Sequence, residues 1–372
     1  MKKILIATGI FPPDIGGPAT YAKKLAEEFF SRRMSATVVT YGKNFEKNPE
    51  YRISGVSRKW SAGLRQFLYF GKILILAKNS EAILILDSLG AGLPSVLAGK
   101  ILRKKTIIRL GGDFLWEKYV ESGKGMVTMA EFYRKMLYKA YPVLNYLIMF
   151  VLKQADVLAF TTNFQKDLYV QYCGIDVRKA AVIGNVFEKK SGAGSLYQET
   201  PKLILWAGRI IKLKNIDFLL RVFKRLLERD NDLVLELIGD GPEKADITNL
   251  VAHLGLSGRV RIIDGLNRNL LLEKMNKSYF GILPSLSEIS PNFALEYLSL
   301  NKPVIITQET GIKDQFPGLL YADPKQEESF IAAAFRLLDK KEYDNYQKLI
   351  SEIKYHKTWK NLADEYLRLI SL

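Results

Sequence analysis

Two cationic side chains, Arg209 and Lys214, follow a strand-like run that ends at Ala207. A planar guanidinium and a compact ammonium are groups that proteins use to bind diphosphates. Gly208, directly ahead of Arg209, lets the backbone approach a ligand closely. Taken alone, the two cations are explained equally well as solvated surface residues. The residue types therefore indicate a diphosphate site that other parts of the sequence must support.

Two carboxylates, Glu288 and Glu296, follow another strand-like run. We expect a helix to begin near Pro291, with Ser290 as its N-cap and the proline at its first position. Glu288 then lies ahead of the helix, and Glu296 lies about one and a half turns inside it. Carboxylates at such an edge accept hydrogen bonds from sugar or ribose hydroxyls, and the free amides of the helix bind phosphate. The alternative for Glu296 is an ordinary exposed helix glutamate.

Glycine-containing loops follow two strands of the first half of the chain. Gly16 and Gly17 precede a helix, where a ligand can approach the backbone, although a plain tight turn is as good an explanation. Asp113 follows Gly111-Gly112 and can orient a substrate hydroxyl or act as a base, or simply stabilise a turn. None of these spacings is the G-x-G-x-x-G fingerprint, which disfavours a nicotinamide-dependent dehydrogenase.

Metal chemistry is disfavoured by the residue types. The chain has one cysteine, Cys173, and two histidines, His253 and His356, which lie far apart in the sequence. The D-x-D triplet 230–232 precedes a strand, so it lies at the edge opposite the expected ligand edge and indicates a helix-to-strand turn. We expect no bound metal, and the lone cysteine excludes an intrachain disulfide.

Short apolar runs alternate with segments of helical period along most of the chain, which is typical of parallel βαβ units. In an open parallel sheet, ligands bind beyond the carboxyl ends of the strands, where the loops above are expected. The expected strands are 4–8, 36–41, 82–87, 106–110, 157–160, 203–207, 233–238, 260–263, 279–283 and 303–306. The expected helices are 21–32, 64–78, 93–103, 130–153, 216–228 and 245–254, with further helices from 326 to 372.

The alternation is interrupted once, by a polar, glycine-rich stretch at 188–195 that we interpret as a linker. The chain of 372 residues is long enough for two domains. We therefore predict an α/β protein with two Rossmann-like, doubly wound parallel-sheet domains facing a cleft, one over residues 1–187 and the other over residues 188–355.

The positive charge is concentrated in the first half of the chain. The formal net charge is +16, and residues 1–200 contain 30 Lys and Arg against 16 Asp and Glu. Residues 51–150 contain 16 against 6, with tyrosines among the basic and apolar residues. This pattern favours contact with an anionic membrane through residues 51–150, and a core helix with a solvated basic face is the alternative. The absence of a signal sequence and of an apolar span predicts a cytoplasmic protein, peripheral on the inner face of the plasma membrane.

Together, these motifs resemble the retaining family-4 glycosyltransferases of bacterial surface-polysaccharide synthesis, which have the GT-B fold. The matching residues, in chain order, are Phe11-Pro12-Pro13, Gly16-Gly17, Gly208-Arg209, Lys214, Gly239-Asp240-Gly241-Pro242, Pro284-Ser285, Glu288, Pro291-Asn292 and Leu295-Glu296. Each motif is weak alone, but their order and spacing match over nearly the whole chain. The sequence departs from the family at Asn215, where a glycine often follows the lysine.

The resemblance implies a role for each matching residue. Glu288 contacts hydroxyls of the donor sugar, and Glu296 holds the ribose of the nucleotide. Arg209 and Lys214 hold the diphosphate and stabilise the charge left on it as the sugar departs. The backbone at Gly16 and Gly17, at Gly208 and around Ser290, Pro291 and Asn292 lines the donor pocket. The last helix, 356–372, would pack back onto the first, acceptor-side domain.

The predicted activity is hexosyl transfer, with retention, from a UDP- or GDP-linked sugar to a sugar or lipid-linked acceptor in cell-surface polysaccharide or glycolipid synthesis. No cofactor and no nucleic acid partner are expected. Two alternatives stay open at this stage. One is a sugar-nucleotide epimerase of the same fold, and the other is a non-catalytic protein that binds nucleic acid or another anion through its basic half.

Overall fold

The computed structural model describes residues 2–14, 16–43, 45, 48–189 and 202–371. Two compact units make up the chain. Unit 1 contains Met1–Leu115, Met136–Val186 and Lys357–Leu372, and unit 2 contains Trp116–Lys135 and Phe187–His356. The segment 116–135 thus belongs to unit 2, although it falls within the range expected for the first domain. Most of the predicted linker 188–195 lies outside the described residues.

Unit 1 is built on a seven-stranded parallel sheet in the order β3-β2-β1-β4-β5-β6-β7. The strands β1, β4 and β5 at its centre are almost fully buried, which explains their continuous apolar sequences. The strands are β1 (Lys3–Ala7), β2 (Ser35–Tyr41), β3 (Tyr51–Val56), β4 (Ala82–Ile85), β5 (Lys105–Leu110), β6 (Val157–Phe160) and β7 (Ala180–Val182).

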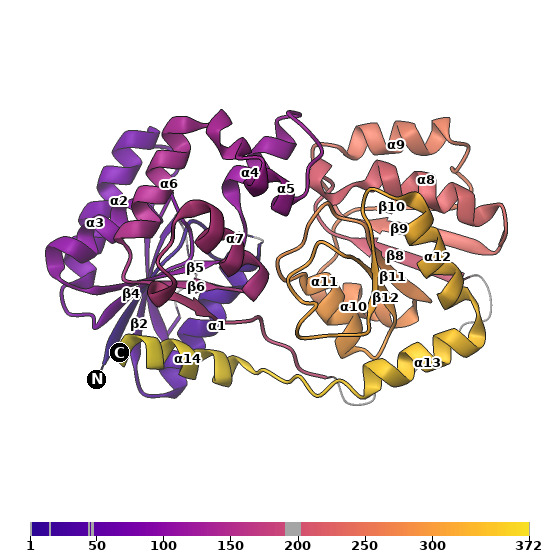
Figure 1. Ribbon diagram of the computed structural model, residues 1–372. Helices are drawn as coiled ribbons and strands as arrows, with labels where there is room; N and C mark the ends of the chain where they lie inside the picture. The colour runs from indigo at the N-terminus through magenta and orange to yellow at the C-terminus, as the bar shows by residue number, and fades with distance from the viewer. Residues whose placement is uncertain (1, 15, 44, 46–47, 190–201, 372) are drawn as a thin grey trace. The chain divides into compact units, whose positions relative to one another are not determined.

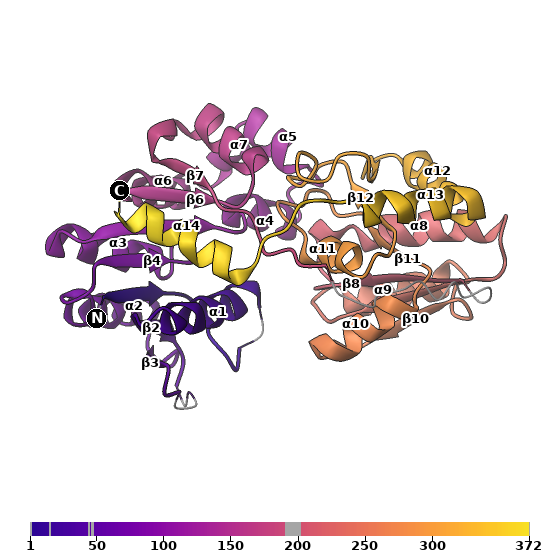
Figure 2. The same cartoon turned by 90° about the horizontal axis from the view of Figure 1, so that it is seen from below.

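Helices cover both faces of this sheet: α1 and α14 pack on one face, and α2, α3 and α6 lie together on the other (Figures 1 and 2). The helices of unit 1 are α1 (Gly17–Ser31), α2 (Ala62–Ala77), α3 (Gly92–Leu102), α6 (Pro142–Gln154), α7 (Asn163–Cys173) and α14 (Trp359–Ser371), with short 3₁₀ turns η1 (Leu137–Ala140) and η2 (Val177–Lys179). Helix α4 (Phe114–Glu121) leads from unit 1 into the segment 116–135, which also contains α5 (Met129–Arg134).

The single helix expected over 130–153 is wrong, because the structure divides this stretch into α5, η1 and α6. Met136 adopts a left-handed conformation with φ of 53°, which ends the first helical piece. Pro142 begins α6, where its missing amide costs nothing, and its ring prevents an uninterrupted helix across this point. Apolar residues keep the spacing of a helix across this break, so the sequence pattern alone did not reveal the break.

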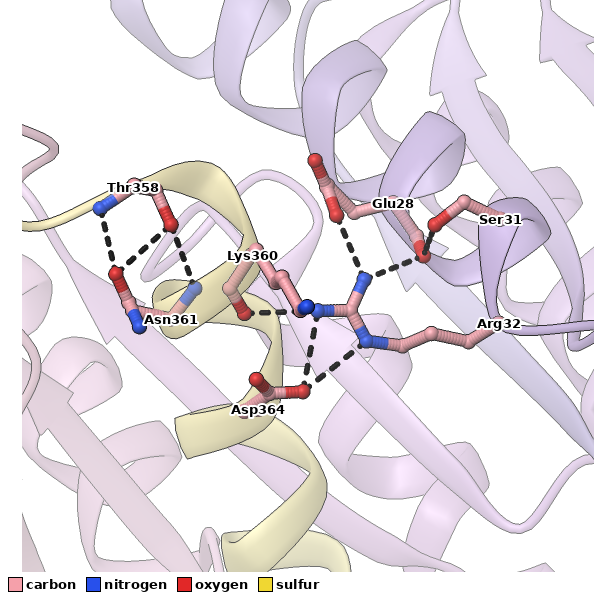
Figure 3. Close-up of polar contacts among 7 residues, drawn as sticks. All are labelled: Glu28, Ser31, Arg32, Thr358, Lys360, Asn361 and Asp364. Carbon is pink, nitrogen blue, oxygen red and sulfur yellow. Dashed lines mark hydrogen bonds and ion pairs between the residues drawn. The ribbon is translucent and has the colours of Figure 1, made fainter.

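Polar contacts of Arg32 join the C-terminal helix α14 to α1. Arg32 donates to the carboxylate of Asp364 at 3.1 Å and to the carbonyl oxygen of Lys360 at 2.8 Å, while Glu28 pairs with it on its own helix (Figure 3). Beneath these contacts, the hydroxyls of Tyr21 and Tyr366 lie 3.0 Å apart in the core. A helix from the end of the chain therefore completes the core of unit 1.

Unit 2 is built on a six-stranded parallel sheet in the order β10-β9-β8-β11-β12-β13. Helices α8, α9 and α12 pack together on one face, and α10 and α11 lie on the other. The strands are β8 (Lys202–Ala207), β9 (Leu233–Ile238), β10 (Val260–Ile263), β11 (Phe280–Leu283), β12 (Val304–Thr307) and β13 (Leu320–Ala322). The helices are η3 (Lys212–Lys214), α8 (Ile216–Leu227), α9 (Lys244–His253), α10 (Arg268–Lys277), α11 (Asn292–Ser299), α12 (Glu327–Leu338) and α13 (Lys340–Ser351). The two parallel-sheet α/β units confirm the predicted fold class.

Candidate active site

The candidate site lies at the carboxyl edge of the sheet of unit 2, between β8 and β11. These two strands are neighbours, and the chain leaves β8 toward β9 but leaves β11 toward β12. The loops that follow them therefore diverge at the topological switch point of the sheet, the position where open parallel sheets bind ligands. The loop after β8 carries Arg209 and Lys214, and the loop after β11 carries Glu288.

An ion pair joins the two loops at this point. The Nζ of Lys214 lies 2.5 Å from Oε1 of Glu288, and the hydroxyl of Ser285 donates to the same oxygen at 2.7 Å. Both charged side chains are mostly buried, with 20% of the lysine and 11% of the glutamate side chain exposed. A charge pair of this kind is held by its neighbours and can exchange partners when a stronger anion such as a diphosphate arrives.

A strand-like contact with residues 309–311 fixes the backbone of Glu288. Its amide donates to the carbonyl of Glu309 at 2.8 Å, and its carbonyl accepts from the amide of Gly311 at 2.9 Å. Residues 288 and 310 form a parallel bridge. The carboxylate is therefore presented from a rigid loop, although it lies outside any regular element.

Asn215 lies where the family that the sequence resembles often has a glycine after the lysine, and its conformation explains why asparagine fits there. It adopts the left-handed conformation with φ of 58°, which asparagine tolerates better than most residues. Its buried side-chain amide donates to the carbonyls of Pro284 and Pro324, at 3.2 and 2.9 Å. Asparagine thus supplies the turn geometry of glycine and also ties the loop after β8 to the loop after β11.

Two glycines of the loop after β9 allow it to pack directly on the loop that follows β8. A Cβ on Gly239 would lie 1.8 Å from the carbonyl oxygen of Gly208, and one on Gly241 would lie 2.2 Å from that of Ile210. The amide of Ile210 donates to the carbonyl of Asp240 at 2.9 Å across the same contact. The Gly239-Asp240-Gly241 motif is therefore required for loop packing, which accounts for it without a ligand.

Arg209 is the exposed cation of the site. Its side chain is 72% exposed, and its guanidinium lies 3.8 Å from the carboxylate of Glu117. An exposed pair at this distance contributes little to stability, about 0–1 kcal/mol. The arginine is therefore positioned at the edge of the switch point and can reorient toward a bound anion at small cost.

The segment 116–135, which no sequence motif indicated as part of the site, packs against these loops within unit 2. The Glu121 carboxylate accepts hydrogen bonds from the amides of Lys212 and Leu213, at 3.3 and 3.0 Å, and so caps the turn η3 that carries Lys214. The hydroxyl of Ser287 accepts from the amide of Met129 at 2.8 Å. No local signal marks Glu121, because its partners lie about ninety residues away in the sequence.

Helix α11 begins one residue later than expected. Pro291 is the N-cap, with ψ of 110° and without a side-chain cap hydrogen bond, so the expected N-cap role of Ser290 is wrong. Proline can serve here because the N-cap contributes its carbonyl, which accepts from the amide of Leu295 at 3.1 Å. Asn292 is exposed at the first position of the helix, and Ser290 is half-buried ahead of it.

Glu296 lies on the second turn of α11, and 20% of its side chain is exposed. Its Oε1 pairs with the guanidinium of Arg268, at the start of α10, at 3.1 Å. Glu296 is thus not an ordinary exposed helix residue. The structure brings Gly208, Lys214 and Glu288 to the switch point, with Arg209 at its edge and Glu296 on the helix that follows the loop of Glu288.

The remaining predicted residues belong to unit 1. Gly16 is the N-cap of α1 and Gly17 its first residue, and a Cβ on Gly17 would meet no atom within 4 Å. Asp113 is 1% exposed and accepts a hydrogen bond from the hydroxyl of Tyr169 at 2.9 Å. Burial against Tyr169 favours a structural role for Asp113 over the predicted contact with a substrate hydroxyl.

Within the residues that the structure describes, no group of three or more His, Cys, Asp or Glu side chains could hold a metal ion. Asp230, of the D-x-D triplet, accepts from the amide of Asp232 in the turn between α8 and β9, at the amino edge of the sheet, as predicted. No helix in the described part of the chain is long and apolar enough to cross a membrane.

Residues 188–357 match the family model described as glycosyl transferases group 1. This part of the chain, which contains Lys214 and Glu288, is therefore similar to the glycosyltransferases of that group. An uncharacterized glycosyltransferase of Methanocaldococcus jannaschii is 25% identical to the whole of this chain, which covers 98% of that relative.

Two solved structures show the same fold along the full chain. Anabaena HepE, in complex with UDP and glucose, superposes with a TM-score of 0.75 at 14% identity, covering 100% of this chain and 99% of its own. The lipopolysaccharide outer core galactosyltransferase WaaB has a TM-score of 0.70 at 16% identity and covers 100% of both chains. The two parallel-sheet units are thus the GT-B fold of glycosyltransferases, and the expected fold is confirmed.

Proposed function

We propose that this protein is a glycosyltransferase that moves a hexose, with retention, from a UDP- or GDP-linked donor to a hydroxyl of a sugar or lipid-linked acceptor in cell-surface polysaccharide or glycolipid synthesis. The observation that carries the proposal is the Lys214–Glu288 pair, 2.5 Å apart at the switch point of unit 2. A cation for the diphosphate and a carboxylate for sugar hydroxyls meet there, on loops that the fold uses for ligands.

The chemistry follows from the charges of these residues. The bond from the anomeric carbon to the diphosphate oxygen breaks, and a bond from that carbon to the acceptor oxygen forms on the same face of the sugar. The proton of the acceptor hydroxyl passes to the departing phosphate. It neutralises the negative charge that the broken bond leaves on the phosphate oxygen. Lys214 and Arg209 stabilise the negative charge that develops on the leaving group, and this stabilisation is the main catalytic contribution. Because two cations are available, the proposed reaction needs no metal.

Glu288 and Glu296 would bind the two ends of the donor. Glu288 accepts hydrogen bonds from hydroxyls of the transferred sugar once Lys214 turns to the diphosphate, while Ser285 keeps its carboxylate oriented. Glu296 accepts from the ribose hydroxyls, and its partner Arg268, which is 67% exposed, is free to move aside. Ser290, Asn292 and the first-turn amides of α11, which lie in the chain between the two carboxylates, would contact the donor there.

A thermal-shift screen against UDP-, GDP- and ADP-sugars tests donor binding. A ligand that binds only the folded chain raises its melting temperature. We expect one base to give a clear shift that is lost in Lys214→Met and kept in Lys224→Met, because Lys224 is an exposed lysine on α8. No shift with any donor would contradict the proposal. Analysis of products from the donor alone separates transferase from epimerase, since only an epimerase isomerises the donor without an acceptor.

We further propose that unit 1 docks on the anionic inner face of the plasma membrane. Large apolar side chains are exposed on the neighbouring helices α2, α3 and α6. They are Leu64, Phe67, Leu68, Ile75, Leu97, Ile101, Val143 and Tyr146. Residues 51–115 and 136–150, the parts of this range that belong to unit 1, contain all of them and carry 12 Lys and Arg against 3 Asp and Glu. Apolar side chains among excess cations fit a surface of anionic lipids.

A further inference from the structure

A surface pocket of unit 2 lies between the beginnings of α8 and α9, two helices that pack against each other (Figure 1). None of the residues assigned to the candidate active site lines it. Its apolar lining comes from the start of α8, from α9 and from the segment 116–135, and consists of Ile211, Ile216, Ile247, Leu250 and Met126. Met126 is 43% exposed, so this lining is accessible from solvent.

The size of the pocket selects a single side chain as its occupant. Its volume is about 270 Å³, whereas sites for whole small molecules have volumes of about 300–1,000 Å³. One large aliphatic or aromatic side chain fills such a space, and buried anchors of this kind contribute much of the binding energy at protein interfaces. Met126 suits a partner side chain, because methionine is flexible and adapts to different apolar shapes.

The charged side chains that line the pocket are mostly negative. They are Asp217, Glu243 and Asp246, against the ammonium of Lys212. Asp217 pairs with Arg221 at 3.1 Å. The carboxylates of Glu243 and Asp246 form no hydrogen bond or ion pair with any residue that the structure describes. In a chain of net charge +16, this pocket therefore repels anionic lipids and nucleic acids and attracts cations.

The two unpaired carboxylates also have an ordinary structural explanation. Glu243 is the N-cap of α9 and Asp246 lies in its first turn, where negative charge interacts favourably with the helix dipole. That explanation does not account for the accessible apolar side chains beside them, which lose contact with water only when something covers them. An apolar pocket with unpaired carboxylates at its edge is complementary to a ligand that is both apolar and cationic.

We propose that this pocket binds a segment of a partner protein in which a large apolar side chain is flanked by Lys or Arg residues. The apolar side chain enters between α8 and α9 against Met126, and the flanking cations pair with Glu243 and Asp246. Complementary charge selects basic segments over acidic ones. The partner also contacts Lys212, at the start of the turn η3 that carries Lys214. The proposal does not depend on the glycosyltransferase function above.

Binding is tested with a defined peptide, acetylated and amidated Lys-Lys-Phe-Lys-Lys, by saturation-transfer NMR with the full chain. One control peptide has serine in place of the phenylalanine, and the other has glutamate in place of the lysines. We expect the wild-type chain to bind the first peptide at least about fivefold more tightly than either control. No binding of the first peptide, or equal binding of either control, overturns the proposal.

The double variant Glu243→Gln/Asp246→Asn removes the two charges with little change in shape. Its matched control is Glu228→Gln/Asp232→Asn, because both residues are exposed near the far end of α8, outside the pocket. We expect the affinity for Lys-Lys-Phe-Lys-Lys to fall at least about fivefold in the first variant, through loss of two ion pairs, and to stay unchanged in the control. Equal affinity of the two variants overturns the proposal.

Met126→Ser tests the apolar contact from a segment outside α9. The affinity for Lys-Lys-Phe-Lys-Lys should fall at least about fivefold, because the phenylalanine loses one wall of its pocket. Unchanged affinity overturns the proposal. The small amine 2-phenylethylamine carries one ring and one ammonium but no peptide. If it binds as tightly as the peptide, the pocket is a site for a small amine, and the assignment to a protein segment is wrong.

Discussion

Lys214 is the residue on which the proposed chemistry depends most directly. Lys214→Met keeps the length of the side chain and removes the charge, so the diphosphate loses a fixed cation as it departs. We expect kcat to fall about a hundredfold or more, which is the effect of removing one charge-stabilising group. The kcat of Arg209→Ala should fall in the same range. Single-turnover kinetics with the donor identified by thermal shift measure this. Near-normal turnover of both variants would refute their assignment.

A buried lysine away from the site gives a prediction about pH. Lys302 is 1% exposed, and burial lowers its pKa to about 8 from the ordinary 10.5. The folded chain therefore loses this proton before the unfolded chain does, and the free energy of unfolding rises with pH between about 8 and 10.5. The gap between the two values corresponds to about 3 kcal/mol that burial of the charge costs at neutral pH.

Lys302→Met should remove this cost. We expect the variant to be about 2–3 kcal/mol more stable than the wild-type chain at neutral pH, and its advantage to shrink as the pH approaches 10. Urea unfolding at two pH values measures the difference. Equal stability of the two proteins at neutral pH would show that the wild-type chain solvates the ammonium without cost.

At the scale of single elements, the packing of α14 on α1 depends on Arg32. Its side chain is 18% exposed and contacts both the carboxylate of Asp364 and the carbonyl of Lys360. Arg32→Ala should lower the free energy of unfolding of unit 1 by about 1–2 kcal/mol, because charge-assisted hydrogen bonds are lost at a partly exposed site. Faster amide hydrogen exchange along α14 would report the loosened helix.

The matched variants for this prediction are Arg32→Lys and Arg178→Ala. A lysine cannot reach Glu28, Asp364 and the carbonyl of Lys360 together, so it should recover only part of the loss. Arg178 pairs with Asp176 two residues away and is 87% exposed, so its removal should leave exchange in α14 unchanged. Unchanged exchange in Arg32→Ala would mean that the aromatic contacts of Tyr21 alone hold the helix.

The helices and strands were largely predictable, because apolar residues are spaced differently along buried parallel strands and along amphipathic helices. The break between α5 and α6 was not, since Met136 adopts its left-handed conformation without a sequence signal and Pro142 can also begin a helix. The start of α11 was shifted by one residue for a similar reason, because proline fits both the N-cap and the first helical position.

The candidate site was predictable only where its residues lie in local motifs. Arg209, Lys214 and Glu288 follow strands, and the edge rule for parallel sheets selects them. Glu121 escaped notice because its role arises from tertiary contacts with distant residues. Asp113 was chosen by its loop, but its burial depends on the distant Tyr169.

For the whole molecule, the uneven charge and the exposed apolar helices lead to one prediction about membranes. Phe67 and Ile75 on α2 are 69% and 75% exposed, although side chains of this size usually contribute to a core. If they enter the interface of a lipid bilayer, each contributes up to about 1.5–3 kcal/mol, and the cations of residues 51–150 add attraction to anionic lipids. The wild-type chain should therefore float with phosphatidylglycerol-containing vesicles and less with phosphatidylcholine alone.

The double variant Phe67→Ser/Ile75→Ser should lose at least about tenfold in affinity for the anionic vesicles, since both apolar side chains are removed from the contact. Val177→Ser is the control, because Val177 is 59% exposed in η2, outside the helices α2, α3 and α6. Raised salt should weaken binding of the wild-type chain by screening its cations. Equal flotation with neutral and anionic vesicles would exclude an electrostatic contribution to membrane binding. Unchanged binding of the double variant would exclude α2 as the helix that contacts the membrane. If both results were obtained, the basic half would be a solvated surface.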